Sequence, residues 1–534
     1  MESKFPIFLV LVAVLAATAL LARRINVAPA IVTLLVGIGL AFVPGMPALE
    51  LPPELVLLGI LPPLIYSASV AMSWREFRFN LRMITLLAVG CVIFTACLVA
   101  TATHYLIGLP WGVGFLLGAI VAPPDVVAPL AVARKLGLPR RLLVVLEGEG
   151  LANDATTLIL YRFAVVAIST GAFSLPKAAG TFAAILICEL VFGLAIGWLS
   201  LRLRHWARDP QFEITLSLLT PYVAYLIPQH LGGSGIIATV AAGLYISWNG
   251  PLLISAATRL QGIFFWDLII FLVEGLLFLL TGFQMRALIE KSKAFPFAEI
   301  VLATALVAAV IVIARFIWVY AAIYVPRMMS RGIRRTDPAP DWKFTFVIAF
   351  TGVRGAVSLA AALALPLTLM SGEAFPARDL ILFVSFNIIL ITVVGFGLGL
   401  PLVVDWLGMG KVGHEEHIAE HEAELEARRD ALAKALASLD AMTDDRELSD
   451  EVVKLLRARH ESRSNQLPAE LDPEVDVSAL GIDLVRELIA AERAFIHAQL
   501  RDGKITDESR RRIERDLDLE EAGLINREFR KVPL

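Results

Sequence analysis

The sequence predicts an all-α membrane protein with about 13 transmembrane helices, followed by a helical tail outside the membrane. Hydrophobic residues make up 57% of the 534 positions and charged residues 18%, whereas soluble domains average about 25% charged residues. The charges are unevenly spread, because residues 5–407 form a succession of apolar stretches and residues 411–534 are dense in Glu, Asp, Arg and Lys. We therefore divide the chain into a transmembrane domain, 1–407, and a helical tail, 408–534, which we expect to regulate the first domain or to contact a second subunit.

Thirteen stretches are apolar enough to cross a bilayer, since each crossing needs about 20 such residues. The first resembles a signal peptide, but its apolar run is long and is followed by Arg23 and Arg24 in place of a cleavage site, so we interpret it as a span. The predicted spans are 5–22, 28–44, 52–72, 82–107, 111–133, 142–170, 175–200, 212–229, 233–249, 262–284, 297–325, 343–370 and 379–405.

Short basic loops predict the orientation, because they prefer the cytoplasmic side of a membrane. With thirteen spans, the basic segments fall on one side, which places the N-terminus outside and the tail in the cytoplasm of a multi-pass inner-membrane protein. Arg286, Lys291 and Lys293 fall on the other side and disagree with this rule. The basic segments that agree are Arg23 and Arg24, 74–82, 134–141, 202–208, Arg259 and 327–335.

Two spans are predicted to be broken helices. In AIVAPPDVVAPLAV, prolines surround Asp125, and proline removes backbone donors from a helix; in GVRG, Gly352 and Gly355 flank Arg354. Irregular backbone is tolerated at membrane depth where it lines a cavity or is buried in protein. A pair of interrupted segments in corresponding positions of two halves indicates a transporter site. We therefore expect an inverted repeat whose two broken helices cross.

Asp154 lies within a segment that otherwise predicts a buried membrane helix. A charge at that depth costs at least about 2.5–3.5 kcal/mol unless it faces protein or a water-filled cavity, so Asp154 is a candidate site for an ion or a proton. The alternative is an aspartate that neighbouring helices satisfy and that holds the bundle together. Na+ and Li+ prefer oxygen ligands, and Asp154, Asp125, the Asn153 side chain and carbonyls of the proline-broken segment could supply them.

A buried carboxylate can couple two ion fluxes without a nucleotide. Burial favours its protonated form and a nearby cation favours its ionised form, so one aspartate can hold a proton or a cation in alternation. The sequence contains no Gly-Lys-Ser/Thr phosphate-binding loop. We therefore expect the gradient of one ion to drive the other, with no enzyme activity and no cofactor.

Arg354 needs a partner in its apolar segment because a guanidinium stays charged, and Glu149 is the partner that we predict. Glu149 and Asp154 are five residues apart, so on a regular helix they point about 140° away from each other. Asp154 would face the cavity and Glu149 the second broken helix. The alternative for Arg354 is an anchor near the end of a span. Glu189 is a further intramembrane acid, which we interpret as structural.

Six strings in the transmembrane domain together resemble the monovalent cation:proton antiporter family that includes the sodium/proton exchangers. They are LPPLIYSA (61–68), APPDVVAPLAV (122–132), EGEGLANDAT (147–156), EITLSLLTPYVAYL (213–226), FLVEGLLFLLTGFQ (271–284) and GVRGAVSLAAALALP (352–366). The resemblance implies that Asp154 binds the cation or the proton, that Asn153 steadies the ion site, and that Asp125 lies close to the ion. It also implies a buried Glu149–Arg354 ion pair and an accessory acid at Glu274.

Three positions depart from the family pattern, and each departure removes a side-chain oxygen from the inferred site. Ser67 stands where many relatives have Glu or Asp, Pro124 replaces a Thr and Gly150 replaces a Ser. Ser67 is therefore only an accessory candidate, and the ion would be held by two carboxylates, carbonyl oxygens and water. The choice among Na+, Li+ and K+ is the property that these departures affect.

The function predicted is secondary active antiport of a monovalent cation, Na+ first and Li+ or K+ as alternatives, against H+. Because Asn153 is neutral, a single titrating Asp154 predicts electroneutral exchange. The partners expected are the two ions, the bilayer and a second copy of the chain in a homodimer, and no nucleic acid. Two rival functions are a cation channel without proton coupling and an intramembrane aspartyl protease, whose Gly-x-Gly-Asp motif neither Asp125 nor Asp154 occupies.

Overall fold

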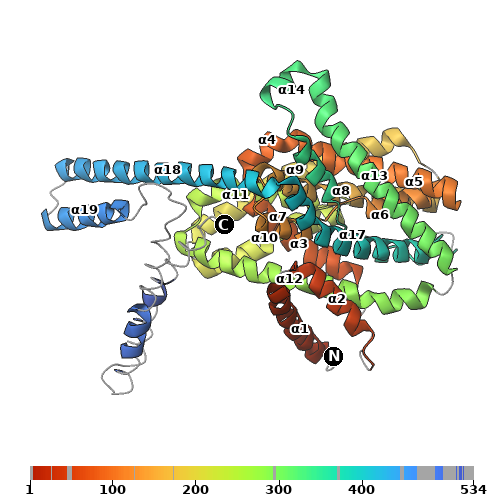
Figure 1. Cartoon of the computed structure of the whole chain (residues 1–534), viewed down its shortest axis with the longest axis horizontal. Helices are drawn as coiled ribbons and strands as arrows, with labels where there is room; N and C mark the ends of the chain where they lie inside the picture. The colour runs from red at the N-terminus through yellow and green to blue at the C-terminus, as the bar shows by residue number, and fades with distance from the viewer. Residues whose placement is uncertain are drawn as a thin grey trace. The chain divides into compact units, whose positions relative to one another are not determined.

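In the part of the chain that it describes, the computed structural model is predominantly helical (Figure 1). That part comprises residues 4–25, 27–44, 51–125, 127–171, 173–207, 209–292, 296–369, 373–445, 450–465, 488–496, 499, 513, 516–519 and 521. Outside the helices these residues form one isolated β-bridge, between Thr368 and Ala374. The predicted all-α fold class is confirmed.

The chain separates into two compact units, Met1–Gly410 and Lys411–Leu534. Helix α18, Met409–Asp445, begins just before the second unit, and α19, Asp450–Asn465, lies within it. The first unit consists of α1 Lys4–Ile25, α2 Pro29–Ala41, α3 Leu61–Ala71, α4 Trp74–Thr85, α5 Val92–Ile107, α6 Trp111–Val121, α7 Val127–Lys135, α8 Arg140–Thr170, α9 Leu175–Ala207, α10 Pro210–His230, α11 Ile236–Leu253, α12 Ala256–Ser292, α13 Phe297–Met329, α14 Arg331–Thr336, α15 Trp342–Phe350, α16 Ala356–Leu363 and α17 Arg378–Leu407. π-Helical turns precede α3 (Leu55–Ile60) and α5 (Leu86–Cys91).

Each of the thirteen predicted spans overlaps one helix, a helix with an adjoining π-helical turn, or a broken pair of helices. Among the described residues, seven helices are long and apolar enough to cross a membrane, namely the continuous helix Trp74–Ile107 together with α8, α9, α11, α12, α13 and α17. Shorter apolar helices are Pro29–Ala41, Leu55–Ala71 and Trp111–Val121. The total of thirteen crossings stays a prediction.

The two predicted helix breaks are present, and they lie against each other. The first break separates α6 from α7, and the second separates α15 from α16. The backbone N–H of Asp125 donates to the carbonyl oxygen of Val353 at 2.7 Å, which joins the two irregular segments directly. Helix α17 packs against α6, α7 and α16. The crossing is therefore enclosed by helices, as backbone with free polar groups must be inside a bilayer.

Buried aliphatic side chains surround the crossing and hold it in place. Leu116 and Ile120 of α6, Leu359 of α16, and Ile381 and Ile388 of α17 are all fully buried or nearly so in one cluster. Fully burying one such side chain is worth roughly 1.5–3 kcal/mol. The irregular backbone thus sits in a frame that packing makes rigid.

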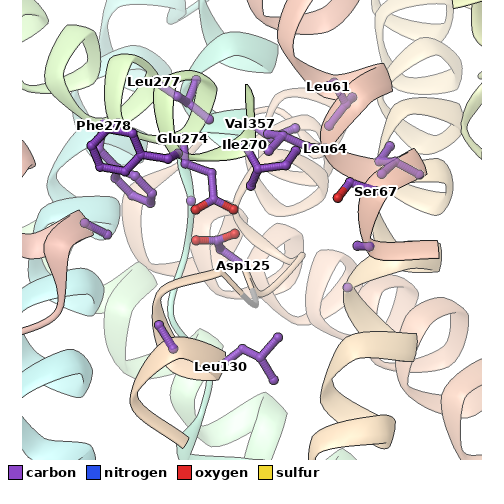
Figure 2. A pocket seen from close by; sticks show the side chains of 18 of the residues that line it. Leu61, Leu64, Ser67, Asp125, Leu130, Ile270, Glu274, Leu277, Phe278 and Val357 are labelled. Carbon is purple, nitrogen blue, oxygen red and sulfur yellow. The ribbon is translucent and has the colours of Figure 1, made fainter. Parts of the chain in front are cut away.

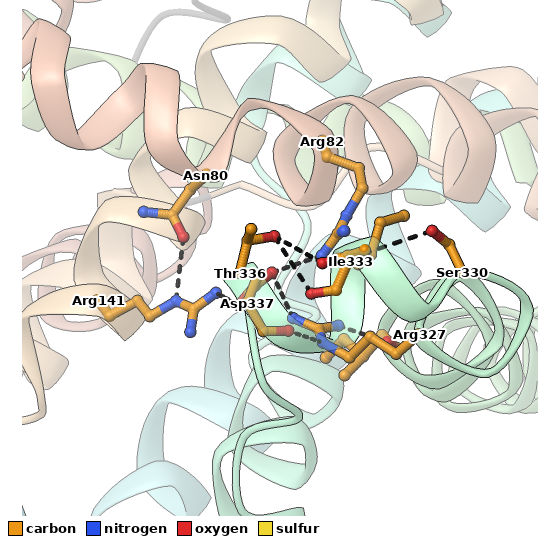
Figure 3. Close-up of polar contacts among 10 residues, drawn as sticks. Asn80, Arg82, Arg141, Arg327, Ser330, Ile333, Thr336 and Asp337 are labelled. Carbon is orange, nitrogen blue, oxygen red and sulfur yellow. Dashed lines mark hydrogen bonds and ion pairs between the residues drawn. The ribbon is translucent and has the colours of Figure 1, made fainter.

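Three of the predicted basic loops meet at one acid, Asp337, between α14 and α15 (Figure 3). The nitrogen–oxygen distances to the Asp337 carboxylate are 2.5 Å for Arg82, 2.7 Å for Arg141 and 2.7 Å for Arg327. Burial raises the pKa of Asp337, but hydrogen bonds from Arg141 and Arg327 and their charges outweigh it and hold the pKa below its ordinary value. The loops 74–82, 134–141 and 327–335 therefore lie at one end of the first unit, as the charge pattern predicts.

Candidate ion-binding site

A cavity of about 530 Å³ opens beside the helix crossing. Its walls come from α1, α2, α3 and α12 and, facing them, from α8, α16 and the broken α6–α7 segment. We call it the acidic cavity. Of the predicted site residues, Ser67, Asp125, Asp154 and Glu274 line it. Figure 2 labels Ser67, Asp125 and Glu274. Side chains that are more than 200 residues apart in sequence are thereby brought to one space.

Asp154 reaches the acidic cavity from α8 and is partly buried. Gly150, one turn earlier, also lines the cavity, so the helix presents no bulk or hydroxyl there. Glu149 and Asn153 are fully buried on other faces of α8. One half of the predicted division of α8 is present, since Asp154 faces the cavity and Glu149 does not line it. Glu149 contacts α13 instead of the second broken helix.

Asp125 lies between α6 and α7, where the helical ladder is interrupted. Pro123 and Pro124 have no N–H groups, so α6 ends at Val121. A Cβ atom on Gly355 would come within 2.6 Å of the Asp125 side chain, so only glycine allows this close approach. Asp125 therefore sits at the N-terminus of α16, where the helix dipole favours a negative charge.

The carboxyl groups of Asp125 and Glu274 point toward each other across the acidic cavity, the first from the broken segment and the second from α12 (Figure 2). Two negative charges that face one another repel each other. A proton or a cation in the cavity would relieve this repulsion. The arrangement can therefore exchange a bound cation for a proton.

Asn153 has a different position from the acids, since it is not among the residues that line the acidic cavity. Its Nδ2 atom donates to the carbonyl oxygen of Pro124 at 2.7 Å. The hydrogen bond fixes α8 to the broken segment next to Asp125. Asn153 thus holds the two aspartate-bearing elements in register.

Glu149 pairs with Arg315 of α13, and this corrects the predicted Glu149–Arg354 ion pair. Arg315 Nη1 lies 2.6 Å from Glu149 Oε1, and Nη2 lies 3.0 Å from Oε2. Both side chains are at most 2% exposed. Arg315 also donates to the carbonyl oxygen of Ile348 in the last turn of α15, at 3.0 Å and 3.3 Å. The bidentate geometry is the strong form of this interaction.

Arg354 is satisfied by backbone oxygens at the crossing. Its Nε donates to Val121 O at 2.9 Å, Nη2 donates to Ala122 O at 3.3 Å, and Nη1 contacts Gly352 O. Val121 and Ala122 are the end of α6, where carbonyls lack helical partners and carry partial negative charge. Arg354 therefore neutralises the partial negative charge at the C-terminal end of α6, and Arg315 does the same at the C-terminal end of α15. This explains why Arg354 does not need the Glu149 carboxylate.

Sequence reasoning missed Arg315, although it carries a readable signal. It is an arginine in the middle of the predicted span 297–325, and such a charge is a functional or structural site by default. It also missed three charged residues that line the acidic cavity, Arg134, Glu147 and Asp267. Glu147 and Asp267 each lie seven residues before a predicted acid, and this helical spacing could have found them.

Glu189 has the structural position that we predicted for it. Its Oε1 accepts from the backbone N–H of Gly235 at 2.9 Å and its Oε2 accepts from that of Ile237 at 3.1 Å. The carboxylate also accepts from the Ser234 backbone and hydroxyl. It therefore caps the N-terminus of α11 and does not line the acidic cavity.

The acidic cavity suits a cation that moves, because its carboxylates are spread along the space. Among the described residues, no group of three His, Cys, Asp or Glu side chains is close enough to hold a metal ion. A cation near Asp125 and Asp154 would need carbonyl oxygens and water to complete its shell. Membrane helices broken at a crossing beside such a cavity are the architecture of ion-coupled secondary transporters.

The chain belongs to the sodium/hydrogen exchanger family, since the family's transmembrane model matches residues 10–406. It is 35% identical over 531 residues to an uncharacterised Na+/H+ exchanger of Mycobacterium tuberculosis, and this match covers 97% of this chain and 96% of that protein. It is 32% identical over 414 residues to a sodium, potassium, lithium and rubidium/H+ antiporter of Bacillus subtilis, and this match covers 75% of this chain and 61% of that protein. The resemblance predicted from the six strings is confirmed.

The fold is similar to that of a sodium proton antiporter from Methanocaldococcus jannaschii. The TM-score is 0.59 at 17% identity, and the match covers 77% of this chain and 99% of that one. The protein is therefore a multi-span membrane protein with an antiporter fold.

Proposed function

We propose that the protein is a secondary active antiporter that exchanges a monovalent cation for H+ across the cell membrane. The observation that carries this proposal is that Asp125, from the break between α6 and α7, and Asp154, from the membrane-length helix α8, line one cavity. Na+ is the cation that we favour, with Li+ and K+ as alternatives. Membership of the sodium/hydrogen exchanger family and the antiport activity named for the Bacillus subtilis relative support this reading.

Asp154 carries the exchange in this proposal. A cation entering the cavity is bound by the ionised Asp154 with Asp125 beside it, and a proton that binds Asp154 displaces the cation. Asn153 keeps the two aspartates in register through Pro124. Both loaded forms differ from the empty site by one positive charge. Exchange is therefore electroneutral, one cation for one proton, provided that Asp125 and Glu274 keep their protonation.

The test is cation-driven dissipation of a pH gradient in proteoliposomes. Asp154→Asn keeps the shape of the side chain and removes its charge, so exchange should be lost, while Asp125→Asn should weaken the apparent affinity for the cation or stop turnover. Asp405→Asn is the matched control, because Asp405 is an exposed residue on α17 that does not line the cavity. Normal exchange in Asp154→Asn would refute the central assignment.

Stoichiometry is tested by clamping the membrane voltage with valinomycin and K+. An electroneutral exchanger runs at the same rate with and without the clamp. Voltage-driven accumulation of the cation without a pH gradient would refute electroneutrality and would make Asp125 or Glu274 an additional proton carrier. Cation flux without any proton movement would instead identify a channel.

The orientation and the assembly belong to the same proposal. We place the basic end, where Arg82, Arg141 and Arg327 meet Asp337, in the cytoplasm, because short basic loops remain on that side. The N-terminus is then outside and the tail inside. A homodimer is expected, and cross-linking in intact membranes measures it. Labelling of a cysteine introduced beside Asp337 by an impermeant reagent from outside would overturn the orientation.

A further inference from the structure

The acidic cavity contains a second pair of acids, which the proposed exchange site does not use. Glu147 is seven residues before Asp154 on α8, and Asp267 is seven residues before Glu274 on α12. Seven residues are about two helical turns, so in each helix both acids face the same way, and all four line the cavity. The cavity thus has two acidic levels: we call Asp154 and Glu274 the inner level, and Glu147 and Asp267 the outer level.

Among the residues that the structure describes, a single basic side chain, Arg134, lines this cavity together with five carboxyl groups, those of Asp125, Glu147, Asp154, Asp267 and Glu274. Arg134 is in the last turn of α7, and its Nη2 forms an ion pair with Glu147 Oε1. The side chain of Arg134 is 58% exposed and that of Glu147 is 17% exposed. The ion pair is therefore part of the cavity wall and is open to water.

We propose that Arg134 is a tethered competitor of the transported cation and sets the apparent cation affinity of the exchanger. The guanidinium keeps its charge at every working pH and occupies the outer acid Glu147. An entering cation meets a carboxylate that is already neutralised and a positive charge that repels it. This inference rests on the proposed antiport and names a further residue that determines its affinity.

The size of the effect follows from the charge of Arg134. A unit charge about 10 Å from a cation, at an effective dielectric constant of about 40 for a water-filled cavity, changes binding by roughly three- to fivefold. Replacing Arg134 by Gln should therefore lower the half-saturating cation concentration by this factor. Salt screens such an interaction, since the Debye length is about 10 Å at 0.1 M. The factor should therefore shrink as ionic strength rises.

Arg140 provides a matched control six residues away. It forms a two-pronged ion pair with Glu76, with Nη2 to Oε2 at 3.0 Å, and it is 53% exposed. Neither Arg140 nor Glu76 lines the acidic cavity. Arg140→Gln therefore removes the same charge from the same end of the protein without changing the wall of the cavity.

The experiment measures the half-saturating Na+ concentration of exchange in proteoliposomes for Arg134→Gln, Arg134→Lys and Arg140→Gln. Arg134→Gln should lower it roughly three- to fivefold, whereas Arg134→Lys and Arg140→Gln should stay close to wild type. Glu147→Gln should raise it, because Arg134 is then unpaired in the cavity. Equal shifts in Arg134→Gln and Arg140→Gln, or no shift in either, would overturn the proposal.

Failure of the proposed antiport is a different result. It would appear as exchange that survives Asp154→Asn, in the wild-type and the Arg134→Gln background alike. Folding is monitored by size-exclusion chromatography of each variant. Arg134 is exposed, so its replacement should leave the elution profile unchanged.

Discussion

Replacing Arg315 with methionine would leave the Glu149 carboxylate buried without its partner. Methionine has a similar length and fills the space with apolar atoms, so the change removes mainly the charge and the hydrogen bonds. Those are the two short contacts to Glu149, at 2.6 Å and 3.0 Å, and the donations to Ile348 O. The perturbation is confined to the interior, because Arg315 and Glu149 are almost fully buried.

The expected loss of stability is large. Breaking one partner of a buried ion pair typically costs about 3–5 kcal/mol, because an uncompensated charge remains. Since 1.4 kcal/mol is a factor of ten, this lowers the ratio of folded to unfolded protein by about 140- to 3,700-fold. Typical domains are stable by only about 5–15 kcal/mol in total. Arg315→Met should therefore reduce both the folded protein in the membrane and the apparent melting temperature in detergent.

Glu149→Gln provides the second half of the test. In the Arg315→Met background it removes the stranded carboxylate, so it should restore part of the stability. In an Arg354→Met background it should instead destabilise further. Arg354 donates to Val121 O and Ala122 O in the wild type, so its loss leaves the Glu149–Arg315 ion pair intact, and Glu149→Gln would then strand Arg315. The measurement is the apparent melting temperature of each variant at one scan rate, since unfolding of such proteins is commonly irreversible.

Two results would refute the reasoning. The first is wild-type stability in Arg315→Met, which would mean that the ion pair contributes nothing. The second is a rescue of Arg354→Met by Glu149→Gln, which would restore the pairing that the sequence predicts.

Three further predictions concern other positions. Because the pKa of Asp337 is lowered in the folded protein, its stabilising effect is present above the unfolded value of about 3.9 and is lost as pH falls toward the folded value. Asp337→Asn should therefore be less stable than wild type at pH 7 and lose less stability from pH 5 to pH 3; equal pH profiles in thermal unfolding would contradict this. Glu189→Gln should cost about 0.5–2 kcal/mol, as for a lost helix cap, with unchanged half-saturating Na+, and a transport defect at wild-type stability would count against the capping role. Asn153→Ala should raise the half-saturating Na+ about two- to twelvefold, which corresponds to roughly 0.5–1.5 kcal/mol for one hydrogen bond, and an unchanged value would show that the contact with Pro124 O does not position Asp125.

The sequence by itself determined the fold class and the two helix breaks, and it predicted that Asp125 and Asp154 lie close together; in the structure both line the acidic cavity. These features depend on signals that lie along the chain. Apolar length indicates spans, the prolines around Asp125 and the glycines around Arg354 interrupt a helix, and a lone carboxylate in an apolar stretch has few stable environments. Each signal is local, so no knowledge of neighbouring helices is needed to read it.

The tertiary structure alone decided which charges are partners. Arg315 lies in α13 and Arg354 in the break between α15 and α16; both are buried, and either could satisfy Glu149 as far as the sequence can tell. The rotation and depth of α13 bring Arg315 to Glu149, while the crossing of α6 with the second break gives Arg354 the carbonyls of Val121 and Ala122. The same holds for Arg134 and Glu147 in the wall of the cavity. An ion pair depends on distances of a few ångströms between helices, and these are set by how the whole bundle packs, which no single segment contains.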